Sequence, residues 1–241
     1  MPLGEPVPLG EPVPAVGPVP PGQPLSSPLE LWWYRTARAI VYGISKVAWR
    51  YQVVGKDLLP QTTPYVLAPV HRSYLDTLFA GAISSRRPWF MAKSGIFSNK
   101  FAAALFRSLG AFPVRRGTAD REALQMCVNA LSSGETVVLF PEGTRGSGPV
   151  LGPLLPGPAY IALRAGVPIV PLGIGGSEQA MPVDAKGLRF NKVVVVVGKP
   201  IWPPADRPSK RVPRNLVDEV TEQLRAELQE LFDTARQLAG S

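Results

Sequence analysis

The sequence is poor in the two side chains that most often serve as nucleophiles, bases and metal ligands. Its 241 residues include one cysteine, Cys127, and one histidine, His71. A single cysteine excludes an intramolecular disulfide, and its apolar neighbours at helical spacing predict a buried core thiol rather than a reactive one. The only histidine must either be incidental or supply a group that titrates near neutral pH.

Several patterns of known function classes are also missing. No run of about 20 apolar residues is free of charge, and the N-terminus lacks the basic-then-apolar pattern of a secretory signal. No segment is therefore expected to span a bilayer by itself. The Gly-x-Ser-x-Gly pattern of α/β serine hydrolases is absent, and so is a second histidine to serve it. Neither a zinc-ligand pattern nor a recognised nucleic-acid-binding motif is present.

The composition that remains indicates a folded, basic protein. Hydrophobic residues make up 45% of the chain, which supplies the core of one domain of about 200 residues with appendages. The formal net charge of +8 implies an anionic partner. Nucleic acid, acidic lipid headgroups and phosphorylated metabolites are all candidates, and charge alone does not choose among them.

The composition changes sharply after the first 28 residues. Residues 1–28 contain ten prolines and repeat Pro-Leu-Gly-Glu-Pro-Val, which predicts a disordered, Pro-rich tail. This tail is either a solvated leader or a ligand for a proline-binding module. Residues 29–55 are expected to form an interfacial helix, and residues 56–241 form the main domain.

Aromatic and basic residues are combined in the helical pattern of residues 29–50. They are Trp32, Trp33, Tyr34, Tyr42, Trp49, Arg35, Arg38, Lys46 and Arg50. Rings and long cationic side chains suit an amphipathic helix that lies in the headgroup layer of a membrane. The alternative is a helix packed on the core of its own domain, but three consecutive aromatic residues cannot all face one narrow stripe. The pattern therefore favours a membrane-associating helix.

The rest of the chain alternates between strand and helix patterns. Strands are predicted at residues 65–69, 89–92, 111–114, 136–140, 169–173 and 193–197, and helices near 74–84, 100–109, 119–132, 157–165 and 216–235. Such alternation predicts an α/β fold. The runs at 137–140 and 193–197 are apolar on both faces, which suits a mostly parallel or mixed central sheet covered by helices.

His71 opens the run His-Arg-Ser-Tyr-Leu-Asp, which ends at Asp76. On a regular helix a separation of five places two side chains roughly 140° apart, so they cannot both be helical and meet. If Ser73 is the N-cap and Asp76 the third helical residue, the histidine can fold back to the carboxylate. The carboxylate would then fix the ring tautomer and leave the other nitrogen to accept a proton from a hydroxyl. Alternatively, Asp76 only closes a capping box and His71 is a loop residue.

Two further segments are typical of anion binding. Residues 140–148, Phe-Pro-Glu-Gly-Thr-Arg-Gly-Ser-Gly, follow a strand pattern and can present backbone N–H groups and a guanidinium to an anion. This loop lacks the lysine spacing of a nucleotide P-loop. Arg115 and Arg116 end another strand pattern, at the edge where α/β sheets place ligands. The simpler alternatives are a surface turn and ordinary solvated charges.

Together with residues 167–172, Val-Pro-Ile-Val-Pro-Leu, these segments resemble in their order the glycerolipid acyltransferase family, which includes the 1-acylglycerol-3-phosphate acyltransferases. The resemblance covers about residues 60–200, and the HxxxxD and Glu-Gly-Thr-Arg segments are its specific parts. It implies an acyltransferase catalytic domain over residues 56–241, with His71 as general base and Asp76 orienting it.

By motif position, the resemblance also assigns the groups that bind substrate. The residues implied in binding the acceptor glycerophosphate are Glu142, Gly143, Thr144 and Arg145. Arg116, with Arg115 beside it, would hold the phosphate, and Lys93 is a further candidate. Two positions depart from the family pattern. Val70 precedes His71 where a small polar residue is frequent, and Gly146 follows Arg145 where a serine is common, which leaves the identity of the acceptor open.

The reaction that the resemblance implies moves a fatty acyl group from a thioester donor to a hydroxyl of a glycerophosphate. The donor would be acyl-coenzyme A or acyl carrier protein, and the expected acceptor is 1-acyl-sn-glycerol 3-phosphate, giving phosphatidic acid. Glycerol 3-phosphate or another phospholipid or glycolipid is the alternative acceptor. No metal, cofactor or covalent acyl-enzyme is expected.

The expected place of action is the cytoplasmic face of an anionic membrane surface, as a peripheral or monotopic protein. Two rival classes explain fewer features. A nucleic-acid-binding domain accounts for the charge but leaves the Trp-rich helix and the His/Asp pair without a role, so nucleic acid is not an expected partner. A noncatalytic peripheral membrane module accounts for the helix and the charge alone.

Overall fold

The structure is a computed structural model of the chain, which describes residues 28–241 with gaps at 85, 94, 96–97, 101–102, 104–105, 108, 115–120, 183–186 and 206–211. The tail predicted at residues 1–28 lies outside the described residues, except for Pro28, at which α1 begins.

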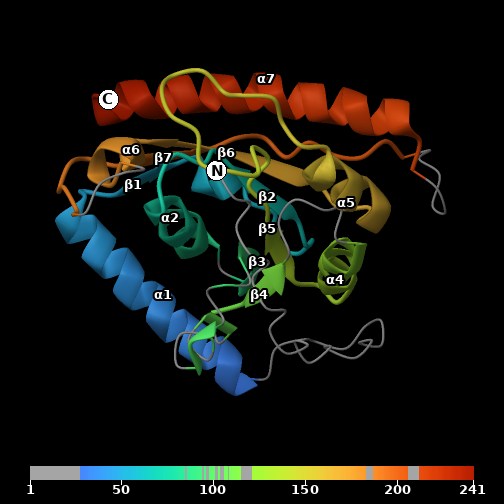
Figure 1. The fold of residues 1–241 in the computed structure, drawn as a ribbon, viewed down its shortest axis with the longest axis horizontal. Coiled ribbons are helices and arrows are strands. Elements are labelled where there is room, and N and C mark those ends of the chain that lie inside the picture. The colour runs from blue at the N-terminus through green and yellow to red at the C-terminus, as the bar shows by residue number, and fades with distance from the viewer. Residues whose placement is uncertain are drawn as a thin grey trace, which may run out of the picture.

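Strands and helices alternate along the chain (Figure 1). The strands are β1 (Gln52–Val54), β2 (Val66–Pro69), β3 (Pro88–Lys93), β4 (Ala111–Val114), β5 (Thr136–Val138), β6 (Ile169–Gly175) and β7 (Val194–Val197). The α-helices are α1 (Pro28–Ala48), α2 (Leu75–Ile83), α4 (Arg121–Ser132), α5 (Gly157–Ala165), α6 (Ser177–Ala180) and α7 (Arg214–Ala239). A short 3₁₀ helix at Lys56–Leu58 follows β1.

All seven strands form one sheet in the order β1-β7-β6-β2-β5-β3-β4. Neighbouring strands pair in parallel, except that β6 and β7 pair antiparallel. The sheet is therefore mixed, as the sequence predicts. Strand β2, which precedes His71, lies in the middle between β5 and β6, so the loops that follow β2 and β5 leave the sheet side by side.

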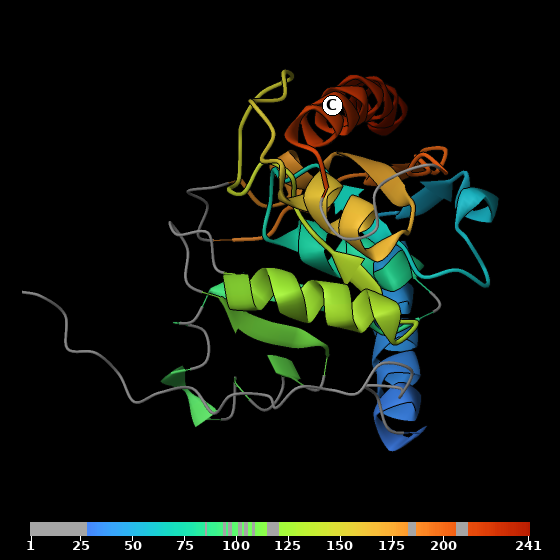
Figure 2. The same cartoon turned by 90° about the vertical axis from the view of Figure 1, so that its right-hand side faces the viewer.

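Helices cover both faces of the sheet. Helices α1 and α2 pack together on one face, and α4, α5 and α7 lie on the other, with the long α7 running along β6 and β7 (Figure 1). The view turned by 90° shows α7 nearly end-on, with α4 near the viewer and α1 on the far side of the sheet (Figure 2). Residues of β5 and β7 are buried whichever face they point to, which matches the apolar pattern of these strands.

Helix α7 approaches β6 closely because Gly173 and Gly175 have no side chains. A Cβ atom at Gly173 would collide with the backbone carbonyl of Leu231, and one at Gly175 would collide with that of Ala235. Both carbonyls belong to α7, one turn apart. The two glycines therefore let the backbone of α7 pack directly against the backbone of β6.

Two elements differ from the sequence-based expectations. Strand β1 was not predicted, because only three residues pair and two of them are exposed, so no apolar alternation is visible. Since β1 pairs with β7, the chain joins the central sheet from Gln52 onward and α1 ends earlier, at Ala48. The helix predicted at 100–109 lies largely outside the described residues.

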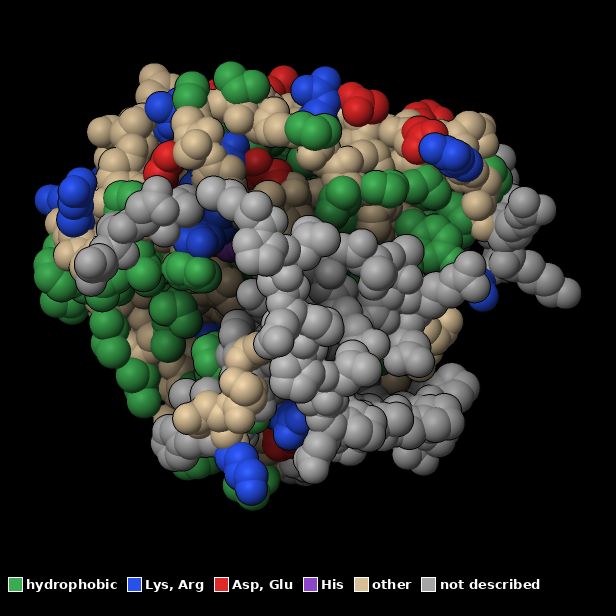
Figure 3. Space-filling model, viewed as in Figure 1, with side chains coloured by type: hydrophobic (Ala, Val, Ile, Leu, Met, Phe, Trp, Pro, Cys, Tyr) green, Lys and Arg blue, Asp and Glu red, His purple; other side chains and the backbone are tan. Residues whose placement is uncertain are grey.

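Helix α1 has one side against the domain and one side open to solvent. Tyr34 Oη donates to Gly81 O over 2.8 Å, and Arg38 Nη1 donates to Ser84 O over 2.9 Å, which ties α1 to α2. The opposite side is defined here as the apolar face of α1, and its exposed residues are Leu29, Trp32, Trp33, Ile40, Ile44 and Val47. Hydrophobic side chains follow this helix along the left edge of Figure 3. Among the described residues, no helix is long and apolar enough to cross a membrane.

Candidate active site

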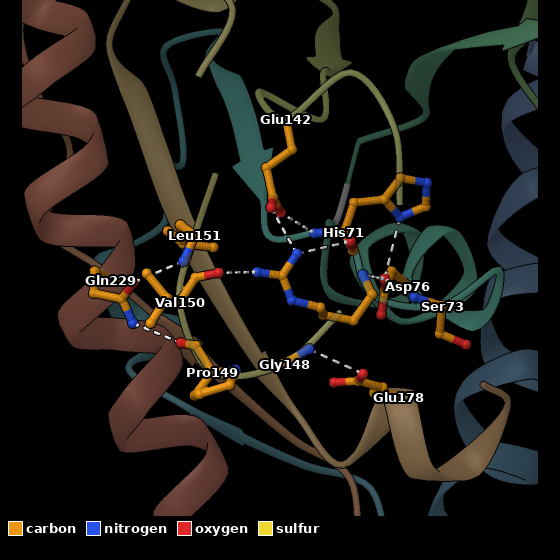
Figure 4. A network of polar contacts seen from close by, with 11 residues as sticks. His71, Ser73, Asp76, Glu142, Gly148, Pro149, Val150, Leu151, Glu178 and Gln229 are labelled. Carbon is orange, nitrogen blue, oxygen red and sulfur yellow. Dashed lines mark hydrogen bonds and ion pairs between the residues drawn. The ribbon is translucent and has the colours of Figure 1, made fainter. Parts of the chain in front are cut away.

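Two loops at the carboxyl ends of β2 and β5 form the site (Figure 4). The histidine loop, residues 70–74, leads from β2 into α2, and the glycine-rich loop, residues 139–148, follows β5. Gly146 N donates to His71 O over 2.9 Å, and His71 N donates to Glu142 Oε1 over 3.0 Å. The two segments that the sequence singles out are therefore hydrogen-bonded to each other.

The side chains of His71 and Asp76 meet at the start of α2. His71 Nδ1 lies 3.2 Å from Asp76 Oδ2, and because an ionised carboxylate only accepts hydrogen bonds, Nδ1 carries the hydrogen. The side chain of Asp76 is fully buried, whereas that of His71 remains 11% exposed. The structure thus brings the two residues together as their spacing predicts, with Nε2 left as the basic nitrogen of the ring.

Asp76 also shapes the turn before α2. Its Oδ2 accepts hydrogen bonds from the backbone N–H groups of Arg72 and Ser73, each over 2.6 Å. Helix α2 begins at Leu75 with Tyr74 as its N-cap, so Asp76 is its second residue and not the third, as was predicted. Ser73 Oγ nevertheless accepts from the N–H of Leu75 over 3.3 Å, as a capping side chain does. Asp76 therefore both closes the turn and holds the imidazole.

The ring of His71 is also held by an aromatic contact. It stacks on Phe140 of the glycine-rich loop, with ring centroids 4.0 Å apart and planes inclined by 28°. Offset stacking restricts rotation of the imidazole about its bond to Cβ. The orientation of Nε2 is thus fixed from two directions, by the carboxylate and by the phenyl ring.

The glycine-rich loop carries a turn beside the histidine. Gly143 N donates to Phe140 O over 3.0 Å, and Gly143 has a φ of +69°, in the left-handed region that favours glycine. Gly143 and Thr144 are exposed. The guanidinium of Arg145 lies over the ring of Tyr74, 3.6 Å from its centroid, which places a cation next to the histidine loop. An exposed loop that carries a cation suits an anionic substrate.

The remaining predicted binding residues are only partly described. The backbone of Lys93 pairs with Val114 where β3 and β4 lie parallel, and its side chain is outside the described part of the structure. Strand β4 ends at Val114, and Arg115 and Arg116 also lie outside the described residues. Since β3, β4 and β5 pair in parallel, Lys93 and Val114 stand at the same sheet edge as the glycine-rich loop.

Arg72 is a site residue that the sequence reasoning missed. Its residue exposure is 1%, and its guanidinium forms an ion pair with Glu142, with Nη1 2.6 Å from Oε2. The available signal was its place between two segments expected to be buried, where an arginine requires a partner. The partner was not readable, because it lies 70 residues away along the chain.

Comparisons with known proteins agree with this geometry. The chain matches the Acyltransferase family over residues 50–175. It is 32% identical over 160 residues to a chloroplastic 1-acyl-sn-glycerol-3-phosphate acyltransferase of Brassica napus, a match that covers 64% of the chain and 46% of that protein. It is 30% identical over 151 residues to the 1-acyl-sn-glycerol-3-phosphate acyltransferase of Bacillus subtilis, covering 62% of the chain and 73% of that protein. The chain therefore spans about half the length of the plant relative.

The fold is shared with a solved structure. The crystal structure of the 1-acyl-sn-glycerophosphate (LPA) acyltransferase PlsC from Thermotoga maritima superposes with a TM-score of 0.64 over 84% of the chain and 87% of that protein, at 20% sequence identity. At this identity the likeness concerns the fold. The family match, in contrast, covers more than half of the chain and includes both loops of the site. The chain belongs to the acyltransferase family.

Proposed function

We propose that this protein transfers an acyl group from a thioester donor to the free hydroxyl of 1-acyl-sn-glycerol 3-phosphate, giving phosphatidic acid. The observation that carries the proposal is the contact of 3.2 Å between His71 Nδ1 and Asp76 Oδ2, beside an exposed loop that carries a cation. The names of the relatives supply the acceptor, since both are 1-acyl-sn-glycerol-3-phosphate acyltransferases.

In the proposed reaction, His71 acts as a general base. Nε2 takes the proton of the acceptor hydroxyl as the oxygen attacks the thioester carbonyl. The tetrahedral intermediate collapses with loss of the thiolate, which receives the proton from the imidazolium. Asp76 stays ionised and stabilises the imidazolium through Nδ1–H. Apart from the N–H bond that forms and breaks on Nε2, every bond made and broken belongs to the two substrates, so the chain supplies only a base, its orienting carboxylate and the binding groups.

The proposed acceptor site is the outer surface of the glycine-rich loop. Gly143 and Thr144 face solvent, and Arg145 offers its guanidinium beside the histidine loop. A phosphate bound there would receive charge-assisted hydrogen bonds. We assign Arg115, Arg116 and Lys93 to the same phosphate, because their strands end at the edge of the sheet that carries this loop.

The proposed place of action is a membrane surface, with the apolar face of α1 in contact with the lipid. Exposed aromatic and aliphatic side chains on one side of a helix, in a chain with a net charge of +8, suit an anionic bilayer such as that of the cytoplasmic face. This surface would deliver an acceptor whose acyl chain stays in the lipid. The donor, acyl-coenzyme A or acyl carrier protein, would approach from the aqueous side.

The test is an acyl-transfer assay with purified full-length protein. Labelled acyl-coenzyme A and acyl carrier protein are each offered with 1-acyl-sn-glycerol 3-phosphate and with glycerol 3-phosphate, in mixed vesicles. Labelled phosphatidic acid is the expected product, and His71→Ala should reduce its formation to background while the circular dichroism spectrum is retained. Substantial activity of His71→Ala would overturn the assignment of the base, and lack of activity of the unaltered protein would overturn the function.

A further inference from the structure

We propose that Arg72 is a positioning residue, which sets the glycine-rich loop in register with His71, and that position 146 is glycine because the Arg72 guanidinium fills the space of a side chain there. The consequence for catalysis rests on the proposed function. The contact itself stands on the structure alone.

The guanidinium of Arg72 lies at the centre of a buried network (Figure 4). Nη1 donates to Glu142 Oε2 over 2.6 Å and to His71 O over 3.2 Å, and Nη2 donates to Val150 O over 3.2 Å. On a further side the guanidinium carbon lies 5.0 Å from the centroid of the Phe232 ring in α7. This one side chain therefore contacts the backbone of His71, Glu142 in the glycine-rich loop and Val150 just after that loop. It also contacts Phe232 of helix α7.

The ion pair is too buried to be an ordinary surface contact. The side chains of Arg72 and Glu142 are only 1% and 6% exposed. Removing two charges from water costs several kcal/mol per ion, so a buried pair is weak support for stability on its own. What this pair does supply is geometry, because a planar guanidinium and a carboxylate meet in few orientations. The pair fixes the distance between the two loops.

Glu142 takes part in this network with both of its oxygens. Oε1 accepts from the backbone N–H of His71 over 3.0 Å, and Oε2 accepts from Arg72. Its carboxylate thus points into the protein, although motif position would group it with the acceptor-binding residues. We therefore assign Glu142 a positioning role together with Arg72, and leave Gly143, Thr144 and Arg145 to contact the acceptor.

Gly146 completes the arrangement by having no side chain. A Cβ atom there would collide with Arg72 Nη1 and would lie 3.1 Å from Glu142 Oε2. The backbone of Gly146 is not among the described glycines with positive φ, so its conformation suits any L-residue. A side chain is therefore excluded by the guanidinium and not by backbone strain. Arg72 and Gly146 form a steric pair, in which enlarging one requires shortening the other.

The experiment combines Gly146→Ala with Arg72→Gln and uses Gly152→Ala as the matched control. Gly152 also lacks a positive φ and has no atom within 4 Å of a built Cβ. Gly146→Ala should raise KM for 1-acyl-sn-glycerol 3-phosphate and lower kcat, by about 10- to 100-fold in kcat/KM, since small displacements between catalytic and binding groups cost this much. KM for the acyl donor should not change. Gly152→Ala should leave all three values unchanged.

The background of Arg72→Gln distinguishes a specific contact from a general loss of stability. In that background, adding Gly146→Ala should change kcat/KM by less than about twofold, because the shorter side chain leaves room for Cβ. Arg72→Lys keeps the charge but loses the planar fork, so its kcat/KM should lie between the values of the wild type and of Arg72→Gln. Arg86→Gln is the control arginine: it removes hydrogen bonds to Gly134 O, Gln61 O and Thr62 O at the opposite sheet edge, and should lower Tm without changing KM.

Several outcomes would overturn the proposal. Gly146→Ala with wild-type kinetics, or with the same cost in both backgrounds, would show that Arg72 and Gly146 are not coupled. Arg72→Gln with unchanged KM and kcat per folded molecule would reduce Arg72 to a structural residue. If Arg72→Gln does not fold, the test is the kcat/KM of Gly146→Ala compared with that of Gly152→Ala, and equal values would overturn the proposal. If the unaltered protein transfers no acyl group, the proposed function fails, and the Tm values of Gly146→Ala, Arg72→Gln, their combination and Gly152→Ala still test the steric pair.

Discussion

Replacing Asp76 by asparagine is the sharpest test of the proposed charge arrangement. The asparagine carbonyl can still accept from the N–H groups of Arg72 and Ser73, which Asp76 Oδ2 binds at 2.6 Å, so the turn before α2 should persist. The amide NH₂ would replace Asp76 Oδ1, which has no hydrogen-bond partner among the described residues. We therefore expect a loss of about 1–2 kcal/mol in the free energy of unfolding.

The effect of the same substitution on the rate should be much larger. The transition state carries an imidazolium, and the lost charge lies 3.2 Å from its Nδ1. At an effective dielectric constant of about 20 this attraction is about 5 kcal/mol, and a hydrogen bond to a charged group is worth at least about 2 kcal/mol. Asp76→Asn should therefore lower kcat by about 30- to 5,000-fold. KM for both substrates should stay within about threefold.

The assay is steady-state acyl transfer, normalised to the folded fraction from thermal unfolding. Asp76→Ala serves as the comparison, because it removes the charge and both backbone contacts and should lower Tm further than Asp76→Asn does. A kcat for Asp76→Asn within threefold of wild type would refute the view that a charged carboxylate supports His71. A loss confined to Tm would show that Asp76 only closes the turn.

Three other predictions concern the scaffold and the surface. Ile44→Glu and Val47→Glu on the apolar face of α1 should weaken sedimentation with anionic vesicles. Leu238→Glu, which introduces the same charge at an exposed position of α7, should not weaken it. Equal binding by all three variants would exclude docking through α1. Gly173→Ala should lower the free energy of unfolding by about 1–3 kcal/mol in denaturant titrations, because its Cβ would push α7 away from β6. An unchanged denaturation midpoint would contradict the close approach of α7 to β6. Burial raises the pKa of the Cys127 thiol above its ordinary value of 9.0, so its contribution to the free energy of unfolding should be constant below about pH 9 and should fall above it. The native thiol should resist thiol reagents, whereas rapid labelling would show that it is accessible.

The sequence was sufficient to predict the class of fold and the contact between His71 and Asp76. Apolar runs such as residues 137–140 mark strands buried on both faces, which indicates a sheet covered by helices. The contact between His71 and Asp76 followed from their spacing once a regular helix was excluded. The start of the helix was mispredicted by one residue, because Ser73 Oγ accepts from the N–H of Leu75 as a capping residue does, whereas the regular helix begins only at Leu75.

What could not be predicted depends on which strands become neighbours. The partners Arg72 and Glu142 meet only because β2 lies next to β5, and no local pattern states that order. The contact of Arg145 with Tyr74 has the same origin. Strand β1 is too short to carry a periodic signal and forms only because β7 offers it an edge. Non-local pairing therefore accounts for most of what sequence reasoning missed.

The junction between α1 and β1 has a consequence for the proposed docking at a membrane surface. The chain passes from the helix into the sheet through Trp49 and Tyr51, both buried; Trp49 Nε1 donates to Arg189 O over 2.9 Å, and Tyr51 Oη donates to Phe79 O over 2.9 Å. These contacts tie the end of α1 to the domain that carries His71. Under the proposed docking of α1 on a membrane they would hold His71 at a fixed height above the lipid, so the acceptor hydroxyl would have to rise to the base.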